Sequence, residues 1–223
     1  MPFATGGYAG KGFFVEAIIL LAGYGSRLDR QDLPHKALLP FGEETLLSRH
    51  LKCLRALGIR KTHLILGHNA SALKTYVQNL NLDLPVHFID NPVFRTTGNT
   101  LSMVMGLKHC QNETLILDGD VLYPPQALLD YVQKAPRSSF ALIPADIDNA
   151  ECAKVLLNPS GTIHAFITKR ELTHEEKSGF GFGKHRISVR NSGFGFVSVF
   201  FQIVNSGFGF VPVLSKFRYF RET

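Results

Sequence analysis

Cysteine is scarce in this 223-residue sequence, and its spacing argues against two classes of small domain. The three cysteines, Cys53, Cys110 and Cys152, are odd in number, far apart and without a C-x-x-C pair. This pattern argues against a disulfide scaffold and against a zinc site. It is typical of a protein kept in a reducing compartment, so we expect a cytoplasmic location.

Long hydrophobic runs and long basic runs are absent too. The apolar run 17–22 is far too short to span a bilayer, and the glycine-rich residues 1–14 lack the basic and then apolar segments of a secretory signal. We expect no membrane partner and interpret residues 1–14 as a flexible leader. The formal net charge is +6, but no run of five or more Lys and Arg residues occurs. We therefore expect no nucleic-acid partner, which leaves an anionic small substrate to explain the basic balance.

What the sequence does contain is a regular alternation of strand and helix patterns. Hydrophobic residues make up 45% and charged residues 19% of the chain, enough apolar content for a real core. Strands are expected at 15–22, 63–67, 85–90, 114–118 and 139–145, and helices at 45–57, 70–80, 99–109 and 124–134. This order predicts an α/β domain with a mainly parallel sheet and helices on both of its faces.

The chain changes character after this region. Residues 153–167 predict a β-hairpin around the turn Asn158-Pro159-Ser160-Gly161. The pentapeptide SGFGF then recurs at positions 178, 192 and 206, a strict period of 14. Three short copies are too few and too short for a solenoid. One interpretation is a β-hairpin or aggregation-prone strands. We favour the other, a tandem duplication or a reading-frame error. We assign 15–172 to the main domain and 173–223 to an atypical Phe/Gly-repeat tail.

A glycine-containing loop directly follows the first expected strand. Gly23 and Gly25 would let the backbone approach phosphates, Ser26 adds a hydroxyl donor, and Arg27 offers a planar fork for phosphate oxygens. A dinucleotide site would have a third glycine where Leu28 stands, and the Gly-Lys-Ser/Thr of a P-loop is absent. The alternative is a tight turn with a surface arginine.

Charged residues of both signs follow at two further places. Lys36 lies nine residues after Arg27 and could join it on a polyphosphate, although a solvated surface lysine is the alternative. Asp118 and Asp120 flank a glycine at the end of the fourth expected strand, where carboxylates can hold Mg²⁺. The alternative for this pair is an Asx-type turn that ends the strand.

A polar segment precedes the third expected helix. Thr97 and Asn99 stand where the loop enters this helix, so their side chains can cap it or can point at a base or ribose. All these motifs fall at carboxyl ends of expected parallel strands, which would place them around one crevice.

Taken together, these stretches resemble the NTP-transferase superfamily over about residues 16–170. The resemblance is carried by AIILLAGYGSRL, LPHKALLPFGEETLLSRHLKCLRALGI, NPVFRTTGNTLSM and LILDGDVLY, and it is strongest to the phosphocholine cytidylyltransferase-like branch. It implies a Rossmann-like nucleotidyltransferase fold with Mg²⁺ as cofactor. It also implies that nucleotide contacts come from Ala22, Gly23, Gly25 and Ser26, phosphate contacts from Arg27 and Lys36, the metal ligand from Asp120, base or acceptor contacts from Thr97, Asn99 and Ser102, and a weaker phosphate contact from Lys169.

The resemblance also implies the reaction and its partners. We expect transfer of a nucleoside monophosphate, CMP being favoured, from an NTP such as CTP to a small phosphorylated alcohol such as phosphocholine. A sugar-1-phosphate acceptor and a catalytically degenerate nucleotide-binding module are the alternatives, with a NAD-type Rossmann protein further behind. Three features depart from the family pattern: LLAG stands for LAAG, His35 separates Pro34 from Lys36, and no Asp occurs after Ser178 to supply a second metal ligand.

Overall fold

The computed structural model describes residues 15–25, 32–134, 154–158, 163–167, 170–179 and 202–204. The expected leader 1–14 and the expected strand 139–145 lie outside these residues, as does most of the Phe/Gly tail. Among the helices in the described ranges, none is long and apolar enough to cross a membrane.

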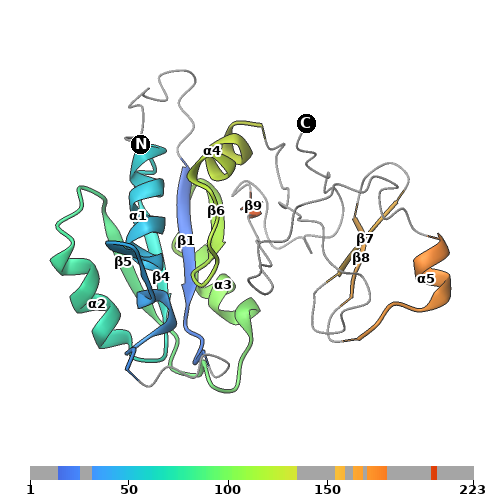
Figure 1. Ribbon diagram of the computed structural model, residues 1–223, viewed down its shortest axis with the longest axis horizontal. Coiled ribbons are helices and arrows are strands. Elements are labelled where there is room, and N and C mark those ends of the chain that lie inside the picture. Colours follow the sequence, from blue (N-terminus) through green and yellow to red (C-terminus); the bar gives the residue numbers. More distant parts are fainter. Residues whose placement is uncertain are drawn as a thin grey trace.

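The centre of the fold is a sheet of five strands in the order β5-β4-β1-β6-β9 (Figure 1). Four strands that the sequence predicts run parallel, namely β1 (Val15–Leu21), β4 (Thr62–Leu66), β5 (Val86–Asp90) and β6 (Glu113–Asp118). β1 and β4 are buried along nearly their whole length, which explains why both appear as continuous apolar runs in the sequence. The expectation of a mainly parallel, Rossmann-like sheet is confirmed.

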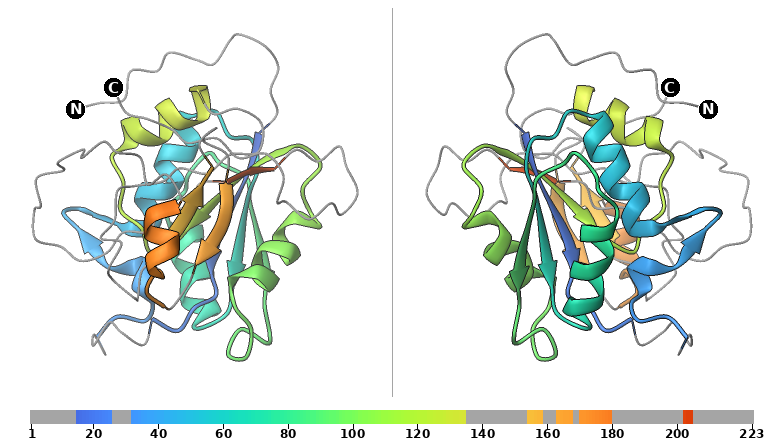
Figure 2. Two further views of the ribbon diagram at one scale, coloured as in Figure 1. Left: turned by 90° about the vertical axis from the view of Figure 1, so that its right-hand side faces the viewer. Right: turned by 90° about the vertical axis from the view of Figure 1, so that its left-hand side faces the viewer.

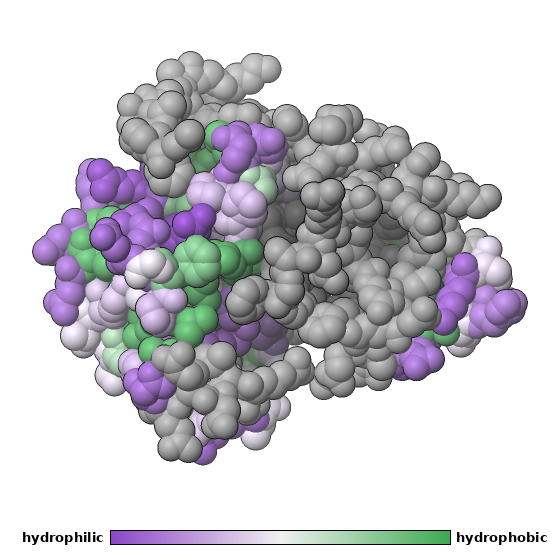
Figure 3. All heavy atoms as spheres, in the orientation of Figure 1, coloured by the Kyte–Doolittle hydropathy of each residue, from purple (hydrophilic) through white to green (hydrophobic). Residues whose placement is uncertain are grey.

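Helices cover both faces of this sheet, as expected (Figure 2). The helices α1 (Leu46–Ala56), α2 (Ala70–Asn79) and α4 (Pro125–Lys134) pack on one face, and α3 (Asn99–Leu107) packs on the other. Figure 3 shows hydrophilic side chains over much of the outer surface around α1 and α2, as suits helices whose apolar sides face a sheet.

Local sequence explains where the first helix begins and ends. Thr45 caps α1 by accepting a hydrogen bond from the Ser48 N–H, while the Ser48 hydroxyl accepts one from the Thr45 N–H. Gly58, which follows the helix, has a φ of +74°, a conformation that favours glycine and ends helices.

Alternate residues of each strand supply the two halves of the core. Ile19 and Leu21 of β1 pack with Leu51 of α1, whereas Ile18 lies on the face that α3 covers. The helices hold the strands in register, so the loops at the carboxyl ends of the strands are fixed relative to one another.

Smaller elements complete the described chain. A short 3-10 turn, η1 (Lys36–Leu38), leads into the two-residue strands β2 (Pro40–Phe41) and β3 (Glu44–Thr45), which the sequence analysis did not assign. The expected hairpin is confirmed as β7 (Lys154–Leu157) and β8 (Ile163–Ile167), and α5 (His174–Gly179) follows it. One segment of the tail, β9 (Gln202–Val204), pairs antiparallel with β6 at the edge of the main sheet.

The strand order places a topological switch point between β1 and β6. The chain moves from β1 outward through β4 to β5, and then returns to the other side of β1 with β6. In open α/β sheets, ligands bind in the crevice at the carboxyl ends of the strands beside such a point.

Candidate functional site: a crevice at the switch point

The loop after β1 forms one wall of this crevice, and its glycines make room for a lysine. Gly25 has a φ of +68°, a region that favours glycine. A Cβ atom added there would lie 3.2 Å from Lys36 Cδ, and one added at Gly23 would lie 3.5 Å from Lys36 Nζ. The Lys36 side chain therefore lies across the glycine loop.

The opposite wall is the Asp-Gly-Asp turn after β6. Lys36 Nζ donates a hydrogen bond of 2.5 Å to Asp120 Oδ2, and the two side chains remain 26% and 45% exposed. The pair joins residues 84 positions apart across the switch point. The structure thus brings the predicted lysine and the predicted metal ligand together, in a position that a solute can reach.

Lys36 is held by its neighbour His35, which the sequence analysis treated only as a departure from the family pattern. The buried His35 ring donates from Nε2 to the Leu21 carbonyl at 3.0 Å and accepts the Ala37 N–H on Nδ1 at 3.1 Å. Burial lowers the pKa of His35 to about 4, so the ring is neutral near pH 7 and keeps these two bonds. This histidine fastens the lysine turn to the end of β1.

An aromatic cluster lies beside the glycine loop. The exposed Tyr24 ring, between the two loop glycines, stacks at 4.2 Å on His68, which follows β4. The Arg95 guanidinium lies 5.9 Å from the Tyr24 ring and 5.7 Å from the Phe94 ring. None of these residues was among the predicted site residues; an exposed aromatic between two glycines was the available signal.

The Asp-Gly-Asp turn packs closely on β1. A Cβ atom at Gly119 would lie 2.1 Å from Leu21 Cδ2 and 2.9 Å from the Leu20 carbonyl oxygen, so only glycine fits without displacement. Burial, reinforced by the charge of Asp120 and opposed by Lys36, raises the pKa of Asp118 to about 6. A carboxyl with a raised pKa beside a second carboxylate is a favourable place for a divalent cation, and the two aspartates suit Mg²⁺ as oxygen donors.

Asp120 also acts electrostatically on a buried pair formed by His50 of α1 and Tyr123. His50 Nδ1 and the Tyr123 hydroxyl are 2.6 Å apart. Burial, together with Arg49 and against the pull of Asp120, lowers the pKa of His50 to about 4. The sequence analysis did not single out either residue.

The predicted base or acceptor residues around the start of α3 have separate environments. The Thr97 hydroxyl donates to the Val93 carbonyl at 2.9 Å, Asn99 is exposed, and Ser102 is buried with its hydroxyl 3.1 Å from Asn91 Nδ2. The capping interpretation of Thr97 and Asn99 is wrong, because Gly98 is the N-cap and has no side chain to accept a bond.

The remaining predicted residues divide into two groups. Ala22 is buried at the end of β1, and its carbonyl accepts the His68 N–H at 3.2 Å. Ser26, Arg27 and Lys169 lie outside the described residues.

Fold and site together define an α/β protein with an ion-paired lysine and aspartate beside a glycine loop at the switch point of a mainly parallel sheet. The family model described as the MobA-like NTP transferase domain matches residues 17–173, and the chain belongs to this family.

Known proteins agree with this assignment. The chain is 29% identical over 126 residues to CMP-5'-(3-aminopropyl)phosphonate synthase of Streptomyces rubellomurinus, covering 56% of this chain and 20% of that protein. It is 28% identical over 166 residues to the bifunctional protein GlmU of Coxiella burnetii, covering 73% of this chain and 35% of that protein. The chain thus spans about a fifth to a third of the length of these relatives. A CTP:phosphocholine cytidylyltransferase from Streptococcus pneumoniae shares the fold with a TM-score of 0.55 and 18% identity, covering 71% of this chain and 66% of that one.

Proposed function

We propose that this chain is a Mg²⁺-dependent nucleotidyltransferase that transfers CMP from CTP to a small phosphorylated alcohol, such as phosphocholine, and releases pyrophosphate. The observation that carries the proposal is the contact of Lys36 with Asp120 across the switch point. It gives one crevice both a cation for phosphate oxygens and a carboxylate for a metal.

The chemistry suits what these residues offer. An oxygen of the acceptor phosphate forms a bond to the α-phosphorus of the nucleotide, and the bond from that phosphorus to the pyrophosphate oxygen breaks. Such phosphoryl-type transfers depend mainly on positioning and on neutralisation of charge. Lys36 supplies the positive charge beside the glycine loop, and His35 fixes the backbone that carries it.

Asp120 and, more weakly, Asp118 would hold the magnesium ion. When bound, the ion neutralises phosphate oxygens and orients them for displacement. The raised pKa of Asp118 supports this role, because a cation between two carboxylates removes the repulsion that contributes to the shift.

The preference for cytidine and for a phosphorylated alcohol has weaker support. It comes from the sequence resemblance and from two similar proteins whose names refer to CMP or CTP. A sugar-1-phosphate acceptor remains the alternative within the same reaction class.

The test is pyrophosphate release by the purified chain with Mg²⁺, crossing CTP, UTP, dTTP, ATP and GTP against phosphocholine, inositol phosphate and sugar-1-phosphates. We expect release with CTP and an alcohol phosphate. Release with a different pair would correct the substrates. Binding of NTP without release from any pair would contradict the proposal and support a degenerate binding module.

Two variants connect any activity to this crevice. Lys36→Ala should lower kcat/KM by about 100-fold or more, because it removes a positioned charge from the reacting phosphates. The matched control is Lys52→Ala, since Lys52 pairs with Glu44 at 2.7 Å on the outer surface of the α1 region. Equal activity of the two variants would show that Lys36 does not act on the phosphates.

A further inference from the structure

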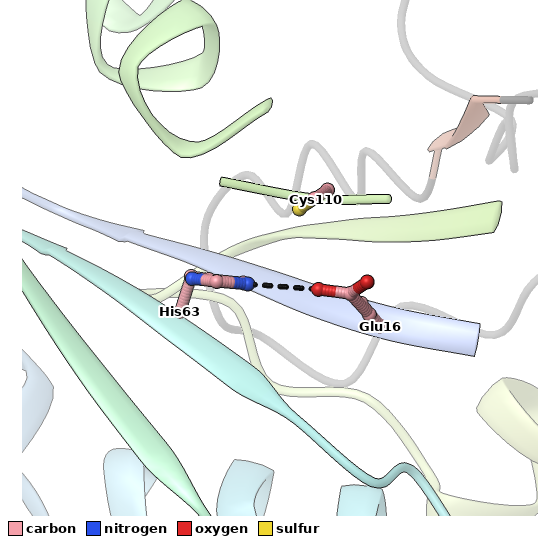
Figure 4. Close-up of side chains that lie close together, drawn as sticks. All are labelled: Glu16, His63 and Cys110. Carbon is pink, nitrogen blue, oxygen red and sulfur yellow. Dashed lines mark hydrogen bonds and ion pairs between the residues drawn. The ribbon is translucent and has the colours of Figure 1, made fainter. Parts of the chain in front are cut away.

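A second cluster of chemically reactive side chains lies within the same domain. Glu16 of β1 and His63 of β4 point toward one another, and Cys110 lies beside them after α3 (Figure 4). One ligand atom from each residue lies within 4.8 Å of the other two. Glu16 and His63 are buried, and Cys110 is partly buried.

This cluster lies near the amino ends of β1 and β4, at the opposite end of these strands from the Lys36–Asp120 pair. Glu16 and His63 are each the second residue of a parallel strand, whereas Lys36 and Asp120 lie beyond the carboxyl ends of those strands. The proposed reaction therefore does not use these three side chains.

The two oxygens of the Glu16 carboxylate have different partners. Oε1 accepts the Gln111 N–H at 3.0 Å and the Asn112 amide at 2.8 Å, which fixes the carboxylate. Oε2 faces His63 Nε2 at 3.0 Å and the Lys61 ammonium at 3.8 Å. Lys61 is 46% exposed, so it can turn toward solvent when another cation arrives.

A shell of further histidines surrounds His63. Its Nδ1 is 3.2 Å from His87 Nδ1, and the His109 ring lies 5.1 Å from the His87 ring. In the metal-free chain the His63 Nε2 hydrogen bonds the ionised Glu16 Oε2. An ion would take the place of this hydrogen, and the neutral ring would then carry its hydrogen on Nδ1, donated to His87. Histidine ligands of metals are commonly oriented by a hydrogen bond of this kind on the other ring nitrogen.

The ionisation states of two of the three groups suit a cation. Burial opposes ionisation of Glu16, but bonds from His63, Gln111 and Asn112 outweigh it and lower its pKa to about 2. Burial lowers the pKa of His63, which keeps the ring neutral, and raises the pKa of the Cys110 thiol. An ion bound here would displace the thiol proton, so binding should weaken as the pH falls.

We propose that Glu16 Oε2, His63 Nε2 and Cys110 Sγ form a zinc-binding site that is separate from the nucleotide crevice. A carboxylate, an imidazole and a thiolate are all ligands of Zn²⁺, and a water molecule can supply the fourth. Bond lengths of about 2.0–2.3 Å place tetrahedral ligand atoms roughly 3.3–3.8 Å apart. Glu16 Oε2 and His63 Nε2, which are 3.0 Å apart, would therefore separate slightly on binding, while Cys110 Sγ, which lies within 4.8 Å of both, would complete the set. The ion would join the starts of β1 and β4 to the connection between α3 and β6.

The sequence pattern gives no sign of such a site. The three ligands are separated by 47 residues in each interval and come from three different elements, unlike the short spacings of zinc motifs. The expectation of no zinc site concerned patterns among cysteines, and only the fold brings a glutamate and a histidine to Cys110.

Titration of the reduced, metal-free full chain with Co²⁺ tests the proposal directly. Cobalt bound to a thiolate gives a strong near-ultraviolet charge-transfer band, which cobalt on histidines alone does not. We expect this band at one equivalent of Co²⁺, its bleaching by Zn²⁺, and its loss in Cys110→Ser. The double variant Cys53→Ser, Cys152→Ser is the matched control and should retain the band, because Cys110 is then its one thiol.

Two further measurements follow the binding of Zn²⁺ itself. Zn²⁺ should raise the Tm of the parent chain but not that of Cys110→Ser or Glu16→Gln, because an ion that binds only the folded state stabilises it. Lys61→Ala should bind Zn²⁺ severalfold more tightly, because it removes the competing ammonium. Absence of the band in the parent, or a band that survives in Cys110→Ser, would overturn the proposal, and neither result depends on nucleotide transfer.

Discussion

The buried His50 should make the stability of the domain strongly dependent on pH. Its side chain is almost completely buried, and its Nε2 atom has no hydrogen-bond partner among the residues that the structure describes. A second proton on the ring would therefore charge a group that has lost its hydration. Burial lowers the pKa of His50 from its usual 6.5 to about 4, so the unfolded chain takes up a proton at a higher pH than the folded one.

The direction and size of the effect follow from linkage. Between pH 6.5 and pH 4 the unfolded state binds more protons, so the free energy of unfolding is highest above pH 6.5 and falls as the pH decreases. A fall in pKa from 6.5 to about 4 is worth about 3 kcal/mol in full, of which about 2 kcal/mol is lost between about pH 7 and about pH 5. A domain with a typical stability of about 5–15 kcal/mol would register this loss clearly.

The assay is urea unfolding of the parent and of His50→Gln at both pH values. Glutamine does not titrate here, and its amide can still bond the Tyr123 hydroxyl, so the variant should lose about 2 kcal/mol less than the parent on acidification. His174→Gln is the control, because this histidine is exposed on α5. If His50→Gln loses as much stability as the parent, burial of His50 does not oppose its protonation and the reasoning is refuted.

Two further predictions concern the turn after β6. Gly119→Ala should reduce the free energy of unfolding by about 1–3 kcal/mol in urea melts, because the new Cβ would lie 2.1 Å from Leu21 Cδ2. Gly98→Ala, where an added Cβ meets nothing within 4 Å, should cost less than about 1 kcal/mol, and equal losses would contradict this account. The Mg²⁺ concentration for half-maximal pyrophosphate release should rise as the pH falls below about 6, because Asp118 becomes protonated there. Asp118→Asn should remove this pH effect, and an unchanged effect would exclude Asp118 as its source.

The strand and helix pattern of the main sheet could be predicted because local sequence and burial agree there. β1 and β4 lie in the interior of a parallel sheet, so their sequences are continuous apolar runs that no surface segment would carry. Alternation with helical spacing then fixed the class of the fold. The position of the candidate crevice followed from chain order alone, since the Gly-Tyr-Gly and Asp-Gly-Asp turns both follow parallel strands.

Contacts between distant segments could not be predicted in the same way. Gln202–Val204 pairs with β6, but nothing in these three residues says which strand they join. Thr97 and Asn99 are candidates for the cap of α3 because their side chains can accept hydrogen bonds, whereas the backbone places Gly98 at that position. Side-chain propensity suggests a cap, but the path of the loop decides which residue occupies it.

His35 departs from the family pattern, yet it helps to hold the backbone next to Lys36 in place. From the sequence, a residue inserted between Pro34 and Lys36 is expected to shift the lysine. In the fold its ring is buried and bonded to the Leu21 carbonyl on one side and to the Ala37 N–H on the other. The bond from the Ala37 N–H requires a neutral ring with a free lone pair on Nδ1, so the same desolvation that lowers the pKa of His35 also preserves this bond. Lys36 follows directly on this anchored backbone, and its side chain, 26% exposed, reaches Asp120 across the switch point.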